Sequence, residues 1–269
     1  RIINGTAAYT GEFTPPSGKL TATGGTYPST TNVNTSITSG HTKLLIQPDK
    51  DDSSIGDETS NHTIASSSWP LIAGSSPYEP EAKSSAIYFD GTTDCLTTAS
   101  STDFAIASGD SFTAECWVWI SSHASNTFDC IFSGFTSTGW AIEINSGYWG
   151  TYDSSGGRQA SSTAATLEEW HHVALVKTDN STDGARLYLN GNKIDDVTIS
   201  SNITSAHAIT LGSYYASDGY SMHGYMFDAR FIKGEEKYTG STYTVPSAPF
   251  ELNPVYLGGD QSGNKHHFT

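Results

Sequence analysis

The sequence predicts an all-β sandwich, and three observations lead to this prediction. From about Ser84 onward, short segments alternate between apolar and polar residues, which is the pattern of half-buried strands. Clusters of Gly, Asp, Asn and Ser flank these segments, which is typical of strands joined by turns. No sustained helical periodicity is present, and a chain of 269 residues with 26 Gly and only 2 Met is a poor candidate for a helical bundle.

The expected strands follow one another at short spacing. They cover residues 86–91, 95–98, 111–120, 128–135, 139–145, 148–153, 168–178, 185–199, 208–215 and 223–234. The segment DNSTDG, residues 179–184, ends in Asp-Gly and predicts a hairpin turn. Residues 19–83 are polar and rich in turn residues, with KLLIQ (residues 43–47) as a short buried strand. We therefore expect residues 19–83 to form an irregular extension with short strands.

The strand at residues 111–120 predicts which side chains enter the core. Phe112, Ala114, Cys116 and Val118 share one face, whereas Glu115, Trp117 and Trp119 share the other. Extending the argument to the neighbouring strands predicts one sandwich core that includes Phe112, Cys116, Val118, Trp170, Val173 and Leu187.

Two segments near opposite ends of the chain resemble each other. Arg1, Gly5, Tyr9, Thr10 and Gly11 recur as Arg230, Gly234, Tyr238, Thr239 and Gly240, and one insertion later Phe13, Thr14, Pro16 and Ser17 recur as Tyr243, Thr244, Pro246 and Ser247. A looser echo links residues 51–64 with residues 259–269. A period of more than 200 residues is the size of a whole domain, so tandem domains fit better than a solenoid. Chance similarity between two Gly/Thr/Pro-rich tails is the alternative.

This repeat divides the chain into four parts. Residues 1–18 are expected to be the tail of a preceding repeat or an exchanged strand, and residues 19–83 the irregular extension. Residues 84–252 are expected to form a complete unit, and residues 253–269 to begin a following repeat. An unpaired strand exposes backbone groups, so we expect residues 1–18 to contact a neighbouring copy and self-association to be a property of the chain.

Five segments in this order resemble a known family. AIYFDGTTDCLTT, SFTAECWVWI, EEWHHVALVKT…ARLYLNGN, LGS and GYMFDARFIKGEEKYTG…PSAPF are similar to the laminin-G-like, concanavalin A-like jelly-roll domain. More narrowly, they resemble the versions found in tandem in virion proteins of tailed, often marine, bacteriophages. The resemblance covers about residues 84–252 and implies a jelly-roll β-sandwich that is extracellular or on a virion surface. It leaves the function open, because this fold hosts lectins, glycosidases, adhesins and spacers.

Charge and cysteine usage exclude several functions. A net charge of −15 disfavours a nucleic-acid surface, which needs a basic stripe. No apolar run approaches the ~20 residues of a membrane-spanning helix, so membrane insertion is not expected. Cys95, Cys116 and Cys130 lack zinc-site spacing and cannot all pair. Cys116 is expected to be a buried apolar side chain, and a Cys95–Cys130 disulfide remains open.

Three features could bind metal, and each has a structural alternative. His171 and His172 have no third ligand spaced nearby, so zinc is not expected. Residues 179–184 mimic the start of a calcium loop but lack the Glu at position 12, where Asn190 stands, so a turn is expected. Asp228 is the candidate for one structural calcium ion, with pairing to Arg230 or another basic group as the alternative. No cofactor is expected to be required.

Aromatic side chains beside turns supply the candidate ligand-binding site. Flat rings mixed with short polar groups can stack on sugar faces and hydrogen-bond their hydroxyls. The candidates for glycan contact are Tyr148, Trp149, Tyr152, Tyr214, Tyr215, Tyr220 and His223. The alternative is that these rings are ordinary core and turn residues, and Trp117, Trp140, Trp149 and Trp170 fit a sandwich core.

Three functions of different classes remain. The favoured one is a non-catalytic structural or adhesive domain of a virion fibre, tail or surface filament that could contact host-surface glycans. The second is the carbohydrate-binding lectin domain of a bacterial cell-surface or secreted adhesin. The third, a glycoside hydrolase, needs two suitably spaced carboxylates. Glu143 has no such neighbour on its strand, and Glu168 and Glu169 are adjacent and point to opposite sides, so no catalytic residues are expected.

Overall fold

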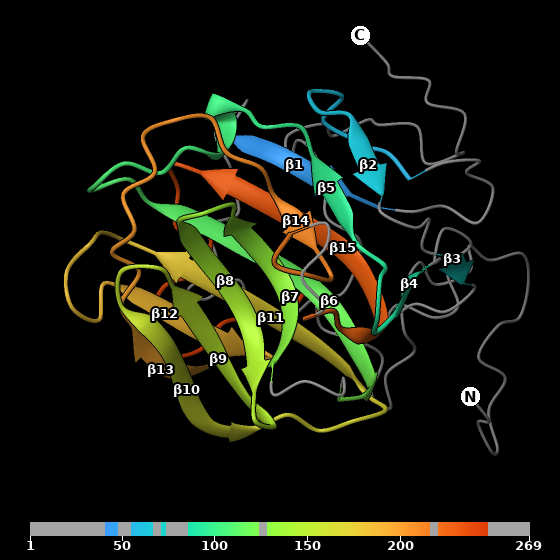
Figure 1. The fold of residues 1–269 in the computed structure, drawn as a ribbon. Helices are drawn as coiled ribbons and strands as arrows, with labels where there is room; N and C mark the ends of the chain where they lie inside the picture. The colour runs from blue at the N-terminus through green and yellow to red at the C-terminus, as the bar shows by residue number, and fades with distance from the viewer. Residues whose placement is uncertain are drawn as a thin grey trace, which may run out of the picture.

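Two antiparallel sheets face each other in the computed structural model of this chain (Figure 1). The structure describes residues 41–47, 55–66, 71–73, 86–123, 128–215 and 220–246. The front sheet, nearer the viewer in Figure 1, contains in order β10 (Gly157–Ala164), β9 (Tyr148–Asp153), β8 (Gly139–Asn145), β7 (Phe128–Phe135), β14 (Thr210–Leu211), β5 (Leu96–Thr98) and β2 (Ile64–Ser66). The back sheet contains β13 (Asn192–Val197), β12 (Ala185–Leu189), β11 (Trp170–Lys177), β6 (Phe112–Ser122), β15 (His223–Lys233), β4 (Ala86–Asp90) and β3 (Leu71–Ala73), with β1 (Thr42–Ile46) paired to β15.

The predicted all-β sandwich is confirmed, and one strand within residues 84–252 was missed. The described residues hold one short 3-10 helix, η1 (Thr102–Phe104), and no α-helix. Strand β10 was missed because its sequence, GRQASSTA, has almost no apolar residues. Among the described residues it is an edge strand that pairs only with β9. Most of its side chains are at least partly exposed, so it needs no apolar face.

The core between the sheets contains five of the six side chains predicted for it. Phe112, Cys116, Val118, Val173 and Leu187 are fully buried in one cluster. Trp170 is the exception, and the prediction for it was wrong. Side chains alternate along a strand, so a residue three positions before the inward-facing Val173 faces outward. Trp170 is half-buried on the outer face of the back sheet, where it lies edge-on to Trp119 with ring centroids 6.0 Å apart.

The three cysteines are buried, and none of them forms a disulfide. The disulfide left open between Cys95 and Cys130 is therefore not formed. Cys116 lies in the main core as expected, whereas Cys130 packs on the outer face of the front sheet.

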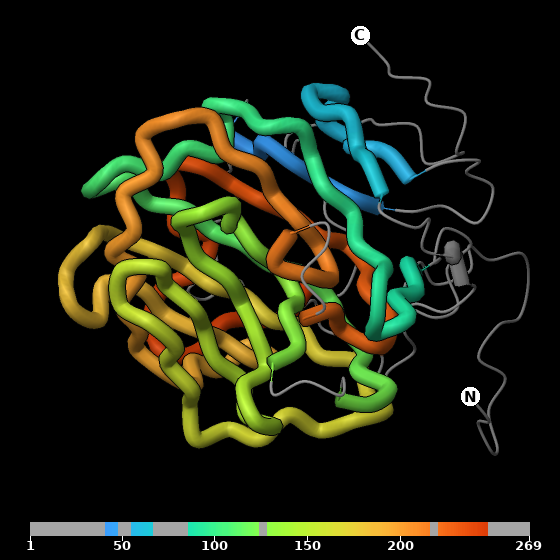
Figure 2. The backbone as a smooth tube through the Cα atoms, viewed as in Figure 1, coloured from blue at the N-terminus to red at the C-terminus, as the bar shows by residue number. Residues whose placement is uncertain are grey.

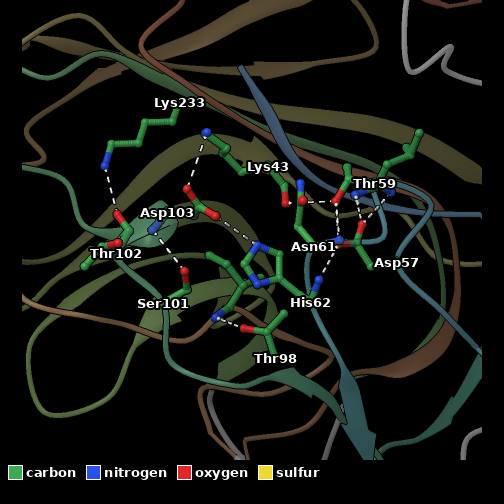
Figure 3. Close-up of polar contacts among 12 residues, drawn as sticks. Lys43, Asp57, Thr59, Asn61, His62, Thr98, Ser101, Thr102, Asp103 and Lys233 are labelled. Atoms are coloured by element: carbon green, nitrogen blue, oxygen red, sulfur yellow. Dashed lines mark hydrogen bonds and ion pairs between the residues drawn. The ribbon is translucent and has the colours of Figure 1, made fainter. Parts of the chain in front are cut away.

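The described part of the N-terminal extension completes both sheets. β1 pairs with the second half of β15, β2 extends the front sheet beyond β5, and β3 extends the back sheet beyond β4. A turn between β1 and β2 is organised by Asp57, whose carboxylate accepts the backbone N–H groups of Leu45, Thr59 and His62 (Figure 3). Asp103 in η1 then joins the two strands through Lys43 and His62, at 3.4 and 3.5 Å (Figure 3).

A segment after β15, residues 234–246, crosses the outer face of the back sheet, and we call it the strap. Two tyrosines of the strap, Tyr238 and Tyr243, are buried against the sheet and stack with ring centroids 3.6 Å apart. The hydroxyl of Tyr188 on β12 donates to the carbonyl of Gly240 at 2.8 Å. The backbone N–H of Tyr243 donates to the carbonyl of Gly191 at 2.7 Å. The strap therefore closes one part of a sheet face that would otherwise be open.

A buried ion pair lies under the strap. Arg230 on β15 donates to Glu115 on the neighbouring strand β6 through Nε at 2.9 Å and Nη2 at 2.5 Å. The Tyr238 hydroxyl donates to the second Glu115 oxygen at 2.5 Å, and His172 Nε2 lies 3.3 Å from it. Burial alone would raise the pKa of Glu115, but Arg230, His172 and Tyr238 lower it to about 2.

The tautomer of His172 follows from this network. Burial lowers the pKa of His172 despite the nearby Glu115 carboxylate, so the ring is neutral at neutral pH. Because ionised Glu115 can only accept, Nε2 carries the proton. Nδ1 then accepts from the Tyr243 hydroxyl at 2.6 Å.

Acid is expected to destabilise the fold through this network. Below about pH 6.5, unfolding lets His172 take up a proton that the native state excludes. Below about pH 4.5, Glu115 is protonated in the unfolded chain but remains ionised when folded, until about pH 2. We expect the Tm measured by circular dichroism to be lower at pH 4 than at pH 7 by about 3 °C or more. A Tm independent of pH over this range would contradict the assignment.

Candidate functional site

Aromatic and charged side chains converge on the outer face of the front sheet. Cys130, Ala141 and Tyr214 are buried there, and Phe135, Tyr152 and Tyr220 are half-buried against them. Glu143 lies on the same face, because it pairs with Cys130 on one side and with Gly150 on the other. We call this group, together with Arg158, Tyr215 and Phe128, the front-face cluster.

Local strand patterns place each member of the cluster. In β8, Trp140, Ile142 and Ile144 enter the core, so Ala141 and Glu143 point outward. A tight turn then returns the chain from β9 to β10, and Arg158 lies directly opposite Tyr152 on the same face.

The described parts of the segment after β14, residues 212–215 and 220–222, lie beside β7 (Figure 2) and carry Tyr214, Tyr215 and Tyr220. The N–H of Cys130 donates to the carbonyl of Tyr220 at 3.0 Å. The Ser133 hydroxyl donates to the carbonyl of Tyr214 at 2.7 Å. These two bonds fasten both ends of the segment to one strand.

Arg158 is held from several sides. Its Nε lies 3.3 Å from one oxygen of Glu143, in ion-pair rather than hydrogen-bond geometry. Its Nη2 donates to the Tyr214 hydroxyl at 3.2 Å, and that hydroxyl donates to the other oxygen of Glu143. The guanidinium carbon stands 3.7 Å from the centroid of the Phe128 ring and 4.9 Å from that of Tyr152. Cation–π contact and the ion pair thus fix the guanidinium in place.

The charge of Glu143 is sensitive to its surroundings. Its side chain is fully buried, whereas that of Arg158 is 29% exposed. Burial raises the pKa of Glu143 to about 7, although Arg158 acts in the opposite direction. Glu143 therefore serves to position Arg158 from below, and Arg158 is the charged group that meets solvent.

The rings of the cluster form a surface around Arg158. Phe135 stacks with Tyr215 at 6.2 Å between centroids and meets Tyr152 edge-on at 5.5 Å. Tyr220 lies edge-on to Phe128 at 5.8 Å. Tyr215 is 44% exposed, which leaves a ring available to stack on a ligand. Such a surface offers flat apolar faces, phenol hydroxyls and one cation.

The structure brings together four of the seven predicted ligand residues: Tyr152, Tyr214, Tyr215 and Tyr220. Tyr148 shares their face of β9 but stands at the far end of the strand, where it is 45% exposed. Trp149, its neighbour, is fully buried in the main core. His223 lies on the back sheet, bonded to Ser122 at 2.6 Å and Tyr88 at 3.1 Å.

Sequence reasoning did not select Arg158, Phe128 or Phe135, and considered Glu143 only as a catalytic group. One signal was available: a glutamate within the alternating run GWAIEIN must lie on the face opposite the core. Its basic partner could not be found in the same way, because Arg158 lies two strands away on the unrecognised β10.

The histidine pair and the segment 179–184, for which metal binding was not expected, have structural partners. His171 Nε2 lies 3.0 Å from the Thr166 hydroxyl. Residues 179–184 form the expected turn, in which the N–H of Gly184 donates to the Ser181 carbonyl at 3.0 Å. Among the residues that the structure describes, no group of three or more His, Cys, Asp and Glu side chains could hold a metal ion.

Asp228 lies at a bulge of β15, where its φ of +56° marks a break in the ladder. β4 pairs with β15 before this point and β1 after it. Gln47, at the end of β1, donates to the buried Asp228 carboxylate. Burial lowers the pKa of Arg230, whereas Glu115 and, to a smaller extent, Asp228 raise it. The nearby guanidinium opposes a dication, so of the two alternatives for Asp228 we favour pairing with its protein partners over a calcium ion.

A chelator is expected to leave stability nearly unchanged. Dialysis against EDTA should shift the Tm by less than about 2 °C. A structural calcium ion present at a free concentration of 100 times its Kd would instead contribute about 2.7 kcal/mol to stability, and its removal would lower the Tm measurably. Re-addition of calcium is the control. A large, calcium-reversible loss of Tm would place a structural ion in the fold.

The family of the chain is shown by its sequence. A laminin G family model, described as the concanavalin A-like lectin/glucanases superfamily, matches residues 90–235, which is more than half of the chain. The chain therefore belongs to this superfamily, and its fold is the concanavalin A-like jelly roll. No curated protein matches the chain in sequence.

Solved structures with the same fold include several binding domains. One is the binding domain of Paraclostridial mosquitocidal protein 1, with 14% identity and a TM-score of 0.55 over 74% of this chain and 50% of that one. A second is domain 4 of AbnA, a GH43 extracellular arabinanase from Geobacillus stearothermophilus, in complex with arabinotriose, with 17% identity and a TM-score of 0.52 over 73% and 95%. A third is the binding domain of botulinum neurotoxin DC in complex with SialylT, with 15% identity and a TM-score of 0.51 over 73% and 48%.

These identities are low, so the likeness shows the shared fold alone. The chain spans about half the length of the mosquitocidal and neurotoxin domains. Within the part of the chain that the structure describes, no helix has the length and apolarity needed to cross a bilayer.

Proposed function

We propose that this chain is a non-catalytic carbohydrate-binding module whose glycan site is the front-face cluster. The observation that carries the proposal is a partly exposed arginine held among aromatic rings by an ion pair and cation–π contacts. Aromatic side chains with a few fixed polar groups are the usual lining of a ligand site. Pre-positioning of Arg158 by Glu143 and Phe128 lowers the entropy lost when a ligand orders the site.

The geometry favours binding over glycoside hydrolysis. Hydrolysis needs two carboxyl groups on either side of the scissile bond, about 5 Å apart for retention and wider for inversion. Among the described residues, the partners of Glu143 are the guanidinium of Arg158 and the hydroxyl of Tyr214. Glu169, at the entry to β11, bonds to Thr166 and is 58% exposed, far from a shielded site.

We further propose that the module is one unit of a tandem array on a virion fibre, tail or surface filament. The repeated segments at residues 1–17 and 230–247 support this arrangement. Repetition of a weak glycan site along one filament would raise avidity without new contacts. The second candidate is a lectin domain of a bacterial cell-surface or secreted adhesin, which would use the same site.

A glycan array tests the binding role. The wild-type chain is expected to bind a subset of glycans, and Tyr215→Ala to lose about tenfold or more of that signal, because a stacking ring is removed. Tyr148→Ala is a matched control, since Tyr148 is equally exposed on the same face but lies outside the cluster. No binding by the wild-type chain, or equal loss in both variants, would contradict the proposal.

A further inference from the structure

The strap explains which residues recur near the N-terminus. In the strap region, four positions have a structural role. Arg230 makes the buried ion pair, Tyr238 is buried against Glu115, and Gly234 and Gly240 have φ of +87° and +76°. Each of the four has the same residue in the N-terminal segment: Arg1, Tyr9, Gly5 and Gly11.

The match also extends into the preceding strand. Arg230, Phe231 and Ile232 are buried at the end of β15, between β6 and β1. Arg1, Ile2 and Ile3 reproduce this charged-apolar-apolar order.

The non-conservative differences fall at partly or fully exposed positions. Glu235, Glu236 and Lys237 are half-buried, and Thr6, Ala7 and Ala8 replace them. The exposed pair Ser241 and Thr242 is replaced by the single residue Glu12. At the buried positions the residues are identical or keep their apolar or aromatic character, as in Arg1 and Arg230, Ile2 and Phe231, and Phe13 and Tyr243. The pattern therefore reflects the same packing requirement.

We propose that residues 1–17 are a second strap, which fits the sheet face formed by Glu115, His172 and Tyr188 in a unit of this kind. The partner of the segment is thus another copy of the same laminin G unit. This inference deepens the tandem arrangement proposed above and rests on it. It does not depend on glycan binding, because the strap lies on the back sheet and the front-face cluster on the other sheet.

The opposite end of the chain carries the matching start of a unit. Asp57 organises the β1–β2 turn (Figure 3), and Ser60 in that turn has φ of +60°. Residues 259–264, GDQSGN, align with residues 56–61, GDETSN. In this alignment Asp260 corresponds to Asp57, and Gly263 corresponds to Ser60, a position where glycine accepts positive φ without strain.

One difference between the two straps gives a sharp test. Tyr243 donates to His172 Nδ1, whereas its counterpart Phe13 has no hydroxyl. A unit closed by residues 5–17 should therefore lack one buried hydrogen bond.

The experiment replaces residues 234–247 of the full chain with residues 5–17 and measures thermal unfolding. The chimera is expected to unfold cooperatively, with a Tm within about 10 °C of the wild type. Restoring the hydroxyl by Phe13→Tyr in the grafted segment should raise its folding equilibrium constant about fivefold or more. A graft with the same residues in scrambled order should lose cooperative unfolding.

Two outcomes would overturn the proposal. One is a chimera no more stable than the scrambled graft. The other is a stable chimera in which replacing the grafted Tyr9 by alanine has no effect on Tm, because the segment would then not use the buried Tyr238 position. The first graft is one residue shorter than the segment it replaces, because Glu12 replaces Ser241 and Thr242. A second graft that keeps Ser241 and Thr242 restores the length and so separates a length effect from a failure to dock. Instability of both grafts also counts against docking. Glycan binding by a folded chimera should equal that of the wild type, so failure here is distinct from failure of the glycan proposal.

Discussion

Replacing Glu115 with alanine is expected to lower the free energy of unfolding by about 3–5 kcal/mol, the usual cost of breaking one side of a buried ion pair. The substitution leaves Arg230 buried without its partner carboxylate. It also removes the acceptor for the Tyr238 hydroxyl and for His172. Urea denaturation of wild type and variant, compared at constant m-value, measures the difference.

A surface pair provides the control for this prediction. Glu236 pairs with Arg186 at 2.8 Å, and both side chains are more than a quarter exposed. Glu236→Ala should cost less than about 1 kcal/mol, as exposed pairs do. Equal losses in the Glu115 and Glu236 variants would show that the buried network does not close the back sheet.

Replacing Arg158 with alanine is expected to weaken glycan binding by about 30-fold or more, the scale of a hot-spot side chain. The variant loses the only cation of the front-face cluster and the support for Tyr152, Tyr214 and Phe128. Isothermal titration with the best glycan from the array measures the affinity.

Arg186→Ala is the matched control for Arg158→Ala. Its side chain is 28% exposed, against 29% for Arg158, and each arginine pairs with one glutamate. Arg186 lies on β12 of the back sheet, so its removal should leave affinity unchanged. An unchanged affinity for Arg158→Ala, with the fold intact, would move the binding site elsewhere.

Most of the fold could be predicted because strand alternation is local. The segment at residues 111–120 predicted that Cys116 enters the core and that Glu115 faces away from it, and both are confirmed. Errors arose where local pattern carries less information. β10 has too few apolar residues to display a phase, and Trp170 was assigned by its apolar character although its position in β11 places it outward.

The candidate site was harder to predict, because its parts come from distant positions. Tyr214 meets Glu143 across 71 residues of sequence, and that contact depends on how the segment after β14 runs along β7. Aromatic composition beside turns was enough to select Tyr152, Tyr214, Tyr215 and Tyr220. It could not separate them from Trp149, which the alternation of β9 turns inward.

A crystal structure of the chain soaked with the best glycan from the array would locate the glycan site. We expect a sugar ring on the outer face of the front sheet, within about 4 Å of the Tyr215 ring and in hydrogen-bond reach of Arg158. A sugar bound on the back sheet, or at the loops away from β7–β10, would contradict this expectation.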